Sequence, residues 1–280
     1  MADELSNMTW WEAQEKFEES RLAIVPVGSM EQHGLHIGLG ADWIQAWAIA
    51  KRVSEKSGAL LLPVQPYGVS GHHKEFPGVI TLESSTLQRV IYEILGSLDR
   101  YGVDRVVFMN GHGGNLGALT GAAKKARDDF GMLCAVVQWW DILDKKSIHG
   151  HPAEEHAGYA ETAFMLASRP EAVKLEYAVL TPTRQVDEEI QLVRAGLARF
   201  KDGVVRIPLS TADVSSTGSM TEAHPDDVPG TKDYSMITRE YAEGLMEEVV
   251  NWMCEFVARF EKLQIPPRSA SKEEAMKELE

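Results

Sequence analysis

A glycine-rich stretch near the N-terminus carries several side chains that commonly bind metals. The stretch is GSMEQHGLHIGLGAD (residues 28–42), and its ligand-type residues are Glu31, His33 and Asp42. Glu31 and His33 are two residues apart, so in an extended segment both side chains point to the same side. Asp42 precedes a run with helical periodicity, and we expect it at the helix N-cap, where backbone N–H groups stabilise a carboxylate. Glycines at positions 34, 38 and 40 allow the loop to fold tightly enough to bring the three together.

This combination favours a divalent metal site over a solvated polar turn. A carboxylate has two oxygens and can bridge two cations, and mixed nitrogen and oxygen ligation suits Zn²⁺, Mn²⁺ or Fe²⁺. Each of the three residues taken singly is equally compatible with an exposed loop, but together they predict a metal site. His36, in the same loop, is a candidate for supporting the ligands or contacting a substrate.

The motif NGHGGN (residues 110–115) supplies a candidate ligand from a second loop. His112 follows a short apolar run, so it leaves a predicted strand at the carboxyl edge of the sheet. A glycine-rich turn between a strand and a helix also suggests phosphate binding, but the GxGxxG spacing and the P-loop Lys–Ser/Thr pair are absent. His112 fits better as a further metal ligand, with Asn110 or Asn115 orienting it.

Two more histidine motifs are candidates for chemistry. His73 lies in GHHKEFPGVITL (residues 71–82), beside a tight turn, and is a candidate substrate contact. In HPAEEHAGYAETA (residues 151–163), Glu155 and His156 are plausible acid–base residues, with an exposed acidic helix start as the alternative. Glu161 lies five residues after His156, so the two share no helix face unless Gly158 interrupts the helix.

Short apolar runs alternate with amphipathic segments along most of the chain. We predict strands at 21–28, 104–111 and 132–141, and a strand with its exit loop within 59–68. We predict helices at 8–19, 42–57, 84–101, 115–129, 154–168, 186–200 and 235–262. This alternation is typical of an α/β fold, with a mostly parallel central sheet and helices on both faces. Ligand sites in such sheets gather at the carboxyl ends of the strands, where most of the candidate residues fall.

Composition bounds the remaining possibilities. The 280 residues predict a single domain, with a peripheral polar tail at about 264–280, and the net charge of −14 argues against nucleic-acid and anionic-membrane partners. No apolar stretch approaches the roughly 20 residues of a membrane span, and the acidic N-terminus does not resemble a secretory signal. Cys134 and Cys254 lie in apolar runs and read as buried free thiols, so we expect a cytoplasmic protein.

Taken together, the motifs resemble the creatininase family (creatinine amidohydrolase and relatives). VPVGSMEQHG followed by Asp42, then FPGVITL, NGHGGN and EHAGYAETA, occur in that family's order and spacing, over about residues 21–168. The resemblance implies a creatininase-like α/β sandwich, assembly as a homohexamer, two divalent metal ions per chain, and hydrolysis of C–N bonds.

The resemblance also implies roles for individual residues. Glu31, His33, His112 and a bridging Asp42 match the metal ligands, and His156 matches the catalytic histidine, with Glu155 as its candidate partner. Trp140, in the run WWD, corresponds to an aromatic stretch near the family's substrate pocket and joins the predicted substrate-binding residues, which are His36, His73, Trp140 and Asn115.

One position departs from creatininase itself. Creatininase has a carboxylate two residues after the histidine of the NGH motif, and this chain has Gly114 there. The departure counts against creatinine as the substrate, and it makes Glu161 the predicted fifth ligand.

The predicted function is a binuclear metal hydrolase acting on a small polar molecule. Two cations would lower the pKa of a bound water from 15.7 toward about 7 and so supply hydroxide at neutral pH. A cyclic amide or a formamide is the preferred substrate class. The enzymatic alternative is ring-opening C–C hydrolysis of a diketo-inositol, and the non-enzymatic alternative is a sugar- or nucleotide-binding protein.

Overall fold

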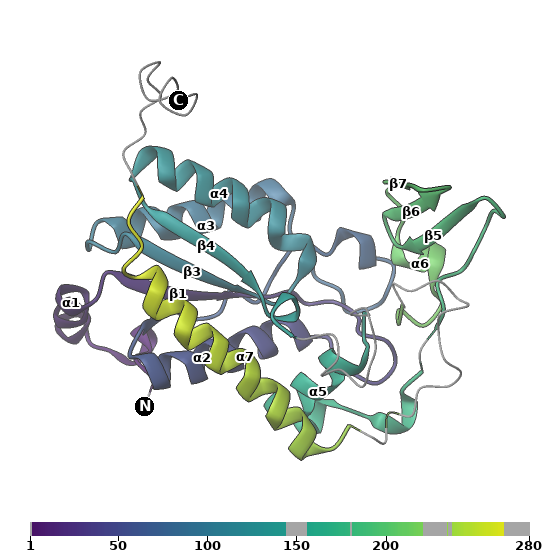
Figure 1. Ribbon diagram of the computed structural model, residues 1–280, viewed down its shortest axis with the longest axis horizontal. Helices are drawn as coiled ribbons and strands as arrows, with labels where there is room; N and C mark the ends of the chain where they lie inside the picture. The colour runs from purple at the N-terminus through teal and green to yellow at the C-terminus, as the bar shows by residue number, and fades with distance from the viewer. Residues whose placement is uncertain (1, 144–155, 180, 221–233, 235–236, 266–280) are drawn as a thin grey trace, which may run out of the picture.

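A computed structural model describes residues 2–143, 156–179, 181–220, 234 and 237–265. Its centre is a four-stranded parallel sheet in the order β2-β1-β3-β4, as Figure 1 shows. The strands are β1 (Leu22–Val27), β2 (Leu60–Leu61), β3 (Arg105–Asn110) and β4 (Leu133–Gln138). Val27 pairs with Asn110, which pairs with Gln138, so three strands end level with one another. The loops that follow them therefore start at one edge of the sheet.

Helices cover both faces of this sheet (Figure 1). One face packs against α2 (Ala41–Ser57), α5 (Tyr159–Ser168) and α7 (Arg239–Phe260), and the other against α3 (Ser84–Asp99) and α4 (Leu116–Asp129). Successive strand residues point to opposite faces. Ile24, Val107 and Met109 accordingly join the first core, and Val25 and Phe108 join the second. The predicted α/β architecture is confirmed.

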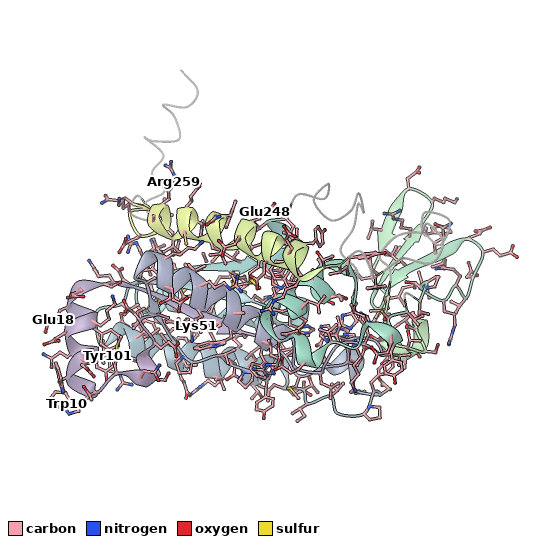
Figure 2. The ribbon with its side chains drawn as sticks, turned by 90° about the horizontal axis from the view of Figure 1, so that it is seen from below. Trp10, Glu18, Lys51, Tyr101, Glu248 and Arg259 are labelled. Carbon is pink, nitrogen blue, oxygen red and sulfur yellow. The ribbon has the colours of Figure 1, made fainter. Side chains whose placement is uncertain are left out.

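Helix α7 lies on the outside of the helices that cover the first face. Figure 2 shows α7 lying along this side of the molecule, with Glu248 and Arg259 at its exposed surface. Arg52 and Lys56 of α2 form ion pairs with Glu243 and Glu247 of α7. Among the described residues, no helix combines the length and the apolar character needed to cross a membrane.

The shorter elements complete the described chain. Helix α1 (Trp10–Glu19) starts with a capping box from Thr9. The remaining helical segments are α6 (Thr211–Val214) and the 3-10 turns Leu5–Asn7, Gly71–His73, Gly113–Asn115, Trp139–Asp141, Pro170–Ala172 and Leu175–Tyr177. Cys134 and Cys254 are free thiols, as predicted, but both are only half-buried.

Several predicted element boundaries were wrong. Within 59–68, where a strand and its exit loop were expected, the strand is only Leu60–Leu61, and Pro63, which has no N–H to donate to a ladder, follows closely. Helix α2 has Gly40 at its N-cap, so Asp42 lies inside the first turn instead of at the cap. Helix α5 begins at Tyr159, with Gly158 as its N-cap.

The helix predicted at 186–200 does not form. The segment is a three-stranded antiparallel sheet of β5 (Ile190–Arg194), β6 (Leu197–Phe200) and β7 (Gly203–Val205). Gly196 has φ of 85° and turns the chain between β5 and β6. The sheet buries Leu192 and Ala198 in a small cluster of its own.

Candidate metal centre

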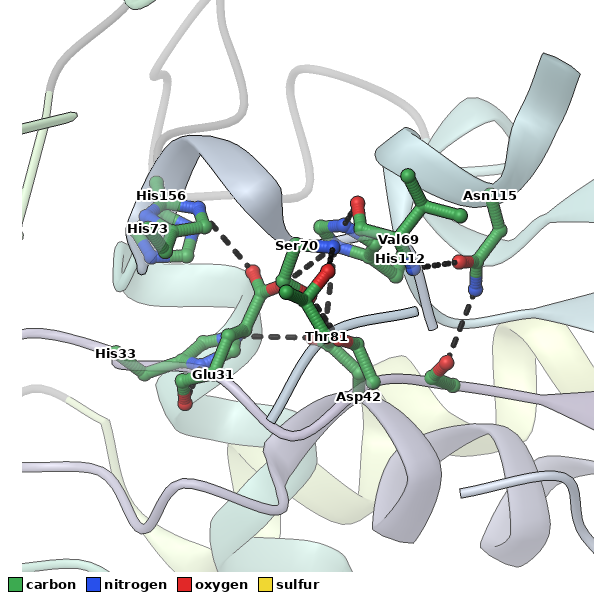
Figure 3. Close-up of polar contacts among 12 residues, drawn as sticks. Glu31, His33, Asp42, Val69, Ser70, His73, Thr81, His112, Asn115 and His156 are labelled. Atoms are coloured by element: carbon green, nitrogen blue, oxygen red, sulfur yellow. Dashed lines mark hydrogen bonds and ion pairs between the residues drawn. The ribbon is translucent and has the colours of Figure 1, made fainter. Parts of the chain in front are cut away.

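Four segments bring their polar residues together at the carboxyl edge of the central sheet (Figure 3). Glu31 and His33 lie in the loop after β1, and His112 lies in the loop after β3. Asp42 and Glu161 lie in the first turns of α2 and α5. The neighbouring parallel strands bring the two loops to one edge, and the two helices begin beside them.

The candidate ligands form two groups that share Asp42. Ligand atoms of Glu31, Asp42 and His112 lie within 4.8 Å of one another, and so do those of His33, Asp42 and Glu161. His112 Nδ1 is 3.1 Å from Glu31 Oε2 and 3.3 Å from Asp42 Oδ2. His33 Nε2 is 2.9 Å from Asp42 Oδ1 and 3.8 Å from Glu161 Oε1. Each oxygen of Asp42 therefore faces a different histidine.

These residues fit a divalent cation. Glu31, His33 and Asp42 are each no more than 2% exposed. His33 Nε2 and Asp42 Oδ2 are buried and make no contact with hydrogen-bond geometry; their nearest opposite charges are Asp42 Oδ1 at 2.9 Å and His112 Nδ1 at 3.3 Å. Buried polar atoms without partners are costly, and a cation between them would satisfy both. Imidazole nitrogen and carboxylate oxygen form the donor set that zinc and manganese accept.

The histidines of both groups are held protonated by the carboxylates around them. Burial by itself would lower the pKa of His33, but the charges of Asp42 and Glu161 outweigh it and raise that pKa to about 10. Burial is likewise outweighed at His112, whose pKa lies well above its usual value because of Glu31 and Asp42. A metal ion at these nitrogens would replace the protons as the counter-charge.

The two outer carboxylates differ in protonation. Burial raises the pKa of Glu161 to about 7; the charge of His33 opposes the rise and that of Asp42 adds to it. Glu31 is also buried, but the charge of His112 and the hydrogen bonds from His112 and His73 outweigh the burial and hold its pKa well below the usual range. At neutral pH Glu31 is thus a carboxylate, whereas Glu161 is only partly ionised until a cation binds.

Hydrogen bonds orient Glu31. The Ser70 hydroxyl donates to Glu31 Oε2 at 2.6 Å, and Ser29 contacts the same hydroxyl. His73 Nε2 lies 3.3 Å from the other oxygen, Glu31 Oε1. Sequence reasoning missed both serines, which are buried and have no motif of their own. It did predict a function for His73, as a substrate contact, and the structure places this residue against a candidate ligand.

Glu161 is held by strained backbone. The Ala157 N–H donates to Glu161 Oε2 at 2.5 Å, and Ala157 has φ of 56°, in the left-handed region. Such conformations cost energy in residues other than glycine and persist where the surroundings enforce them. His156 precedes this residue and lies outside α5, because Gly158 caps the helix.

A backbone carbonyl selects which nitrogen of His112 faces the carboxylates. His112 Nε2 lies 3.0 Å from the Val69 carbonyl oxygen, which can only accept, so Nε2 carries the proton. A Cβ at Gly114 would lie 2.2 Å from that carbonyl oxygen and 2.5 Å from His112 Nε2. The contact thus requires glycine at the position where creatininase carries a carboxylate.

His156 lies at the edge of the cluster. Its ring centroid is 4.6 Å from that of His33 and 4.6 Å from that of His73. A ligand atom of His156 also lies within 4.8 Å of those of Glu31 and His33. Burial holds the pKa of His156 well below its usual value. This histidine is therefore neutral at pH 7. Glu155, its predicted partner, lies outside the described residues.

The other predicted substrate contacts have different surroundings. His36 is 1% exposed and its Nε2 lies 3.0 Å from the Thr162 hydroxyl. The Asn115 amide donates to Gly28 O and Asn110 Oδ1 and accepts from Val69 N–H, which leaves no amide hydrogen for a substrate. We therefore propose neither His36 nor Asn115 as a substrate contact, because both side chains are buried and hydrogen-bonded within the protein.

The two tryptophans of the WWD run follow β4. Trp140 packs edge-on against Trp139, with ring centroids 5.5 Å apart. Trp139 is fully buried in the core, while Trp140 is half-buried. Trp140 remains a predicted substrate contact.

Comparison with known proteins places the chain in a family. Residues 6–257 match the family described as creatininase (creatinine amidohydrolase). The chain is 33% identical to the mycofactocin precursor peptide peptidase of Mycolicibacterium smegmatis over 62% of this chain and 69% of that protein. It is 32% identical to the creatinine amidohydrolase of Pseudomonas putida over 64% of this chain and 76% of that protein. It is 24% identical to the 3-dehydro-scyllo-inosose hydrolase of Thermotoga maritima over 98% of this chain and 89% of that protein.

Solved structures support the same assignment. A crystal structure of creatininase superposes with a TM-score of 0.73 at 26% identity, covering 94% of this chain and 99% of that one. A manganese creatininase gives 0.72 and a Zn–Zn form of a creatininase mutant gives 0.70, both at 26% identity and covering 92% of this chain and 98% of the other. The chain therefore belongs to the creatininase family, and it is a hydrolase.

Proposed function

We propose that this protein uses two divalent metal ions per chain to hydrolyse a C–N bond in a small polar amide. The observation that carries the proposal is Asp42, whose two oxygens face His33 and His112 in two separate ligand groups. One ion would be held by Glu31, Asp42 and His112. The other would be held by His33, Asp42 and Glu161.

The chain's own residues divide the work around these ions. Divalent metals in such a site supply Lewis-acid chemistry, which acidifies water and polarises a carbonyl oxygen. Ser70 and His73 hold the carboxylate of Glu31 in place. His156, neutral at pH 7, takes a proton and passes it to the leaving nitrogen. Glu155 and Trp140 keep the roles predicted from the sequence, as a partner in proton transfer and a wall of the substrate pocket.

The relatives support the metal and the bond type. Creatininase has been solved in manganese and Zn–Zn forms, so Mn²⁺ and Zn²⁺ are the ions to test first, and Fe²⁺ suits the same donors. An amidohydrolase and a peptidase both act on C–N bonds, which favours an amide substrate. Because the matches are to enzymes, they also argue against a non-catalytic binding protein. By family resemblance we propose a homohexamer, which light scattering can test.

Metal content tests the shared ligand. We expect about two Zn²⁺ or Mn²⁺ per chain, by elemental analysis, in protein purified without chelator. The isosteric substitution Asp42→Asn should lose both ions, whereas His33→Ala and His112→Ala should each lose one. A single ion in the wild type, or an Asp42→Asn protein that keeps two, would contradict the proposal.

A substrate screen tests the bond type. The panel contains cyclic amides, formamides, short peptides and dehydro-inositols, assayed with Mn²⁺ or Zn²⁺. Ring-opening of a diketo-inositol is the second candidate, because the inosose hydrolase relative aligns with nearly the whole chain. Hydrolysis of an amide supports the proposal, and activity confined to the cyclitols replaces it with the second candidate.

A further inference from the structure

Gln32 lies between two candidate metal ligands, and its side chain is held in a single orientation. The side chain is 4% exposed. Its Oε1 accepts from the Gly34 N–H at 3.0 Å, and its Nε2 donates to the Gly218 carbonyl at 3.2 Å. Because an N–H can only donate and a carbonyl can only accept, these contacts fix which end of the amide is nitrogen.

The amide nitrogen faces two histidines that are not among the proposed ligands. Gln32 Nε2 is 2.8 Å from His73 Nδ1 and 2.9 Å from His156 Nε2. His156 Nε2 is also 2.7 Å from the main-chain carbonyl oxygen of Gln32. That carbonyl can only accept and is the shorter contact, so it takes the proton of His156 Nε2, and Gln32 Nε2 then makes no hydrogen bond to that nitrogen. The two amide hydrogens are then accounted for by His73 Nδ1 and the Gly218 carbonyl.

This count determines the protonation of His73. A nitrogen that accepts from an amide N–H carries no proton, so the ring proton of His73 sits on Nε2. His73 Nε2 lies 3.3 Å from Glu31 Oε1, and the proton completes a hydrogen bond to that carboxylate. Glu31 then receives His73 at one oxygen and the Ser70 hydroxyl at the other.

We propose that Gln32 is a positioning residue that fixes the tautomers of His73 and His156. Its side-chain amide makes His73 a donor to Glu31. Its main-chain carbonyl holds the proton of His156 on Nε2, so His156 Nδ1 is the nitrogen that takes up a proton. The catalytic consequence rests on the proposed function, but the tautomers rest on these contacts alone.

A distant segment contributes to this arrangement. Gly218 has φ of 87°, and a Cβ there would lie 1.7 Å from Gln32 Oε1. The Met220 N–H donates to the His156 carbonyl at 3.2 Å, so the same turn contacts both Gln32 and His156. The turn thus approaches closely enough to hold the amide only because residue 218 is glycine.

Nitrogen NMR of the histidine rings tests the proposal without a substrate. The protein is labelled with ¹⁵N-histidine and measured with Zn²⁺, which is diamagnetic, and His73→Asn and His156→Asn variants assign the two rings. We expect a bare Nδ1 and a protonated Nε2 for both rings in the wild type. A protonated Nδ1 on wild-type His73 would overturn the proposal, whether or not any Gln32 variant folds.

The Gln32→Glu variant separates the two rings. It keeps the shape but replaces the amide N–H by a carboxylate oxygen, so His73 Nδ1 should shift to the protonated resonance. His156 should keep its pattern, because the main-chain carbonyl is unchanged. Gln65→Glu is the control, since Gln65 is half-buried in the loop after β2 and donates to Tyr67 O; neither ring should shift. An unchanged His73 spectrum in Gln32→Glu would overturn the proposal. A wild-type protein that binds no metal would instead contradict the proposed function.

Discussion

Gly114 shows how one missing side chain shapes the candidate site. Without a Cβ at this position, the Val69 carbonyl reaches His112 Nε2 and turns Nδ1 toward the carboxylates. The residue that distinguishes this chain from creatininase therefore contributes to ligand orientation. Groups that orient metal-bound histidines affect affinity nearly as strongly as the ligands do.

Adding a methyl group at this position should weaken one metal site. In Gly114→Ala the new Cβ would displace either Val69 or His112, so we expect Zn²⁺ affinity at the His112 group to fall about 10- to 100-fold. Calorimetric titration with Zn²⁺ measures it. Gly113→Ala is the control, because nothing lies within 4 Å of a Cβ there. Equal affinities in the two variants would contradict the proposed orientation of His112.

His36 should make stability depend on pH. Burial, aided by the charge of His33, lowers its pKa to about 4 from an unfolded value near 6.5. Between these values the unfolded chain takes up a proton that the folded protein does not, so stability falls as pH falls from 6.5 to 4. When the pH falls from 7.5 to 5, the free energy of unfolding should decrease less in His36→Gln than in the wild type, by up to about 2 kcal/mol. Urea unfolding at the two pH values measures this difference. Parallel pH profiles for the two proteins would exclude this contribution.

At the scale of elements, the start of α2 is packed directly on the ends of β1 and β3. A Cβ at Gly28 would lie 2.3 Å from Trp43 Cα, and one at Gly111 would lie 2.1 Å from Asp42 O. Each strand is therefore followed by a glycine at the point where the helix backbone comes closest. This close approach is what brings the carboxylate of Asp42 between the two loops.

The packing predicts opposite effects for two Gly→Ala substitutions. Gly111→Ala should destabilise the protein by about 1–3 kcal/mol, because the helix start must move away from β3. Gly244 is an exposed residue of α7, and a Cβ there would have no neighbour within 4 Å. Gly244→Ala should therefore stabilise the protein by about 0.5–1 kcal/mol. Chemical denaturation measures both. A Gly111→Ala protein as stable as the wild type would show that the helix start is not constrained.

At the scale of the whole molecule, the candidate centre joins segments far apart in the chain. Glu31, Asp42, His112 and Glu161 come from two loops and two helices, and they concentrate buried charge at one place. A ligand that binds only the folded state stabilises it by mass action. Metal binding should thus stabilise the whole fold.

Metal removal should lower the melting temperature. Zn²⁺ at 100 times its Kd adds about 2.7 kcal/mol to the free energy of unfolding, and EDTA removes that gain. In differential scanning calorimetry the melting temperature should rise with Zn²⁺ concentration in the wild type but not in Asp42→Asn. Asp99→Asn, an exposed change on α3, should respond like the wild type. A Zn²⁺ response retained in Asp42→Asn would place the stabilising ion elsewhere.

Local patterns accounted for the architecture and the candidate ligands. Buried strands and amphipathic helices depend on the spacing of nearby residues, so the parallel sheet and the helices on its faces were predicted from the sequence. The same local reasoning failed at 186–200, where the turn at Gly196 and pairing between strands outweigh helical spacing. It also placed Asp42 at the N-cap, whereas Asp42 lies two residues after the cap residue, Gly40.

The sequence alone determined which side chains gather at the carboxyl edge of the sheet, because the order of strands and loops follows from the spacing of nearby residues. Only the tertiary structure decided what each of them faces. Ser70 reaches Glu31 across 39 residues, and Gly218 reaches Gln32 across 186. No local pattern encodes such contacts, since they depend on how whole elements pack. The shared position of Asp42 and the tautomers assigned by Gln32 follow from that packing.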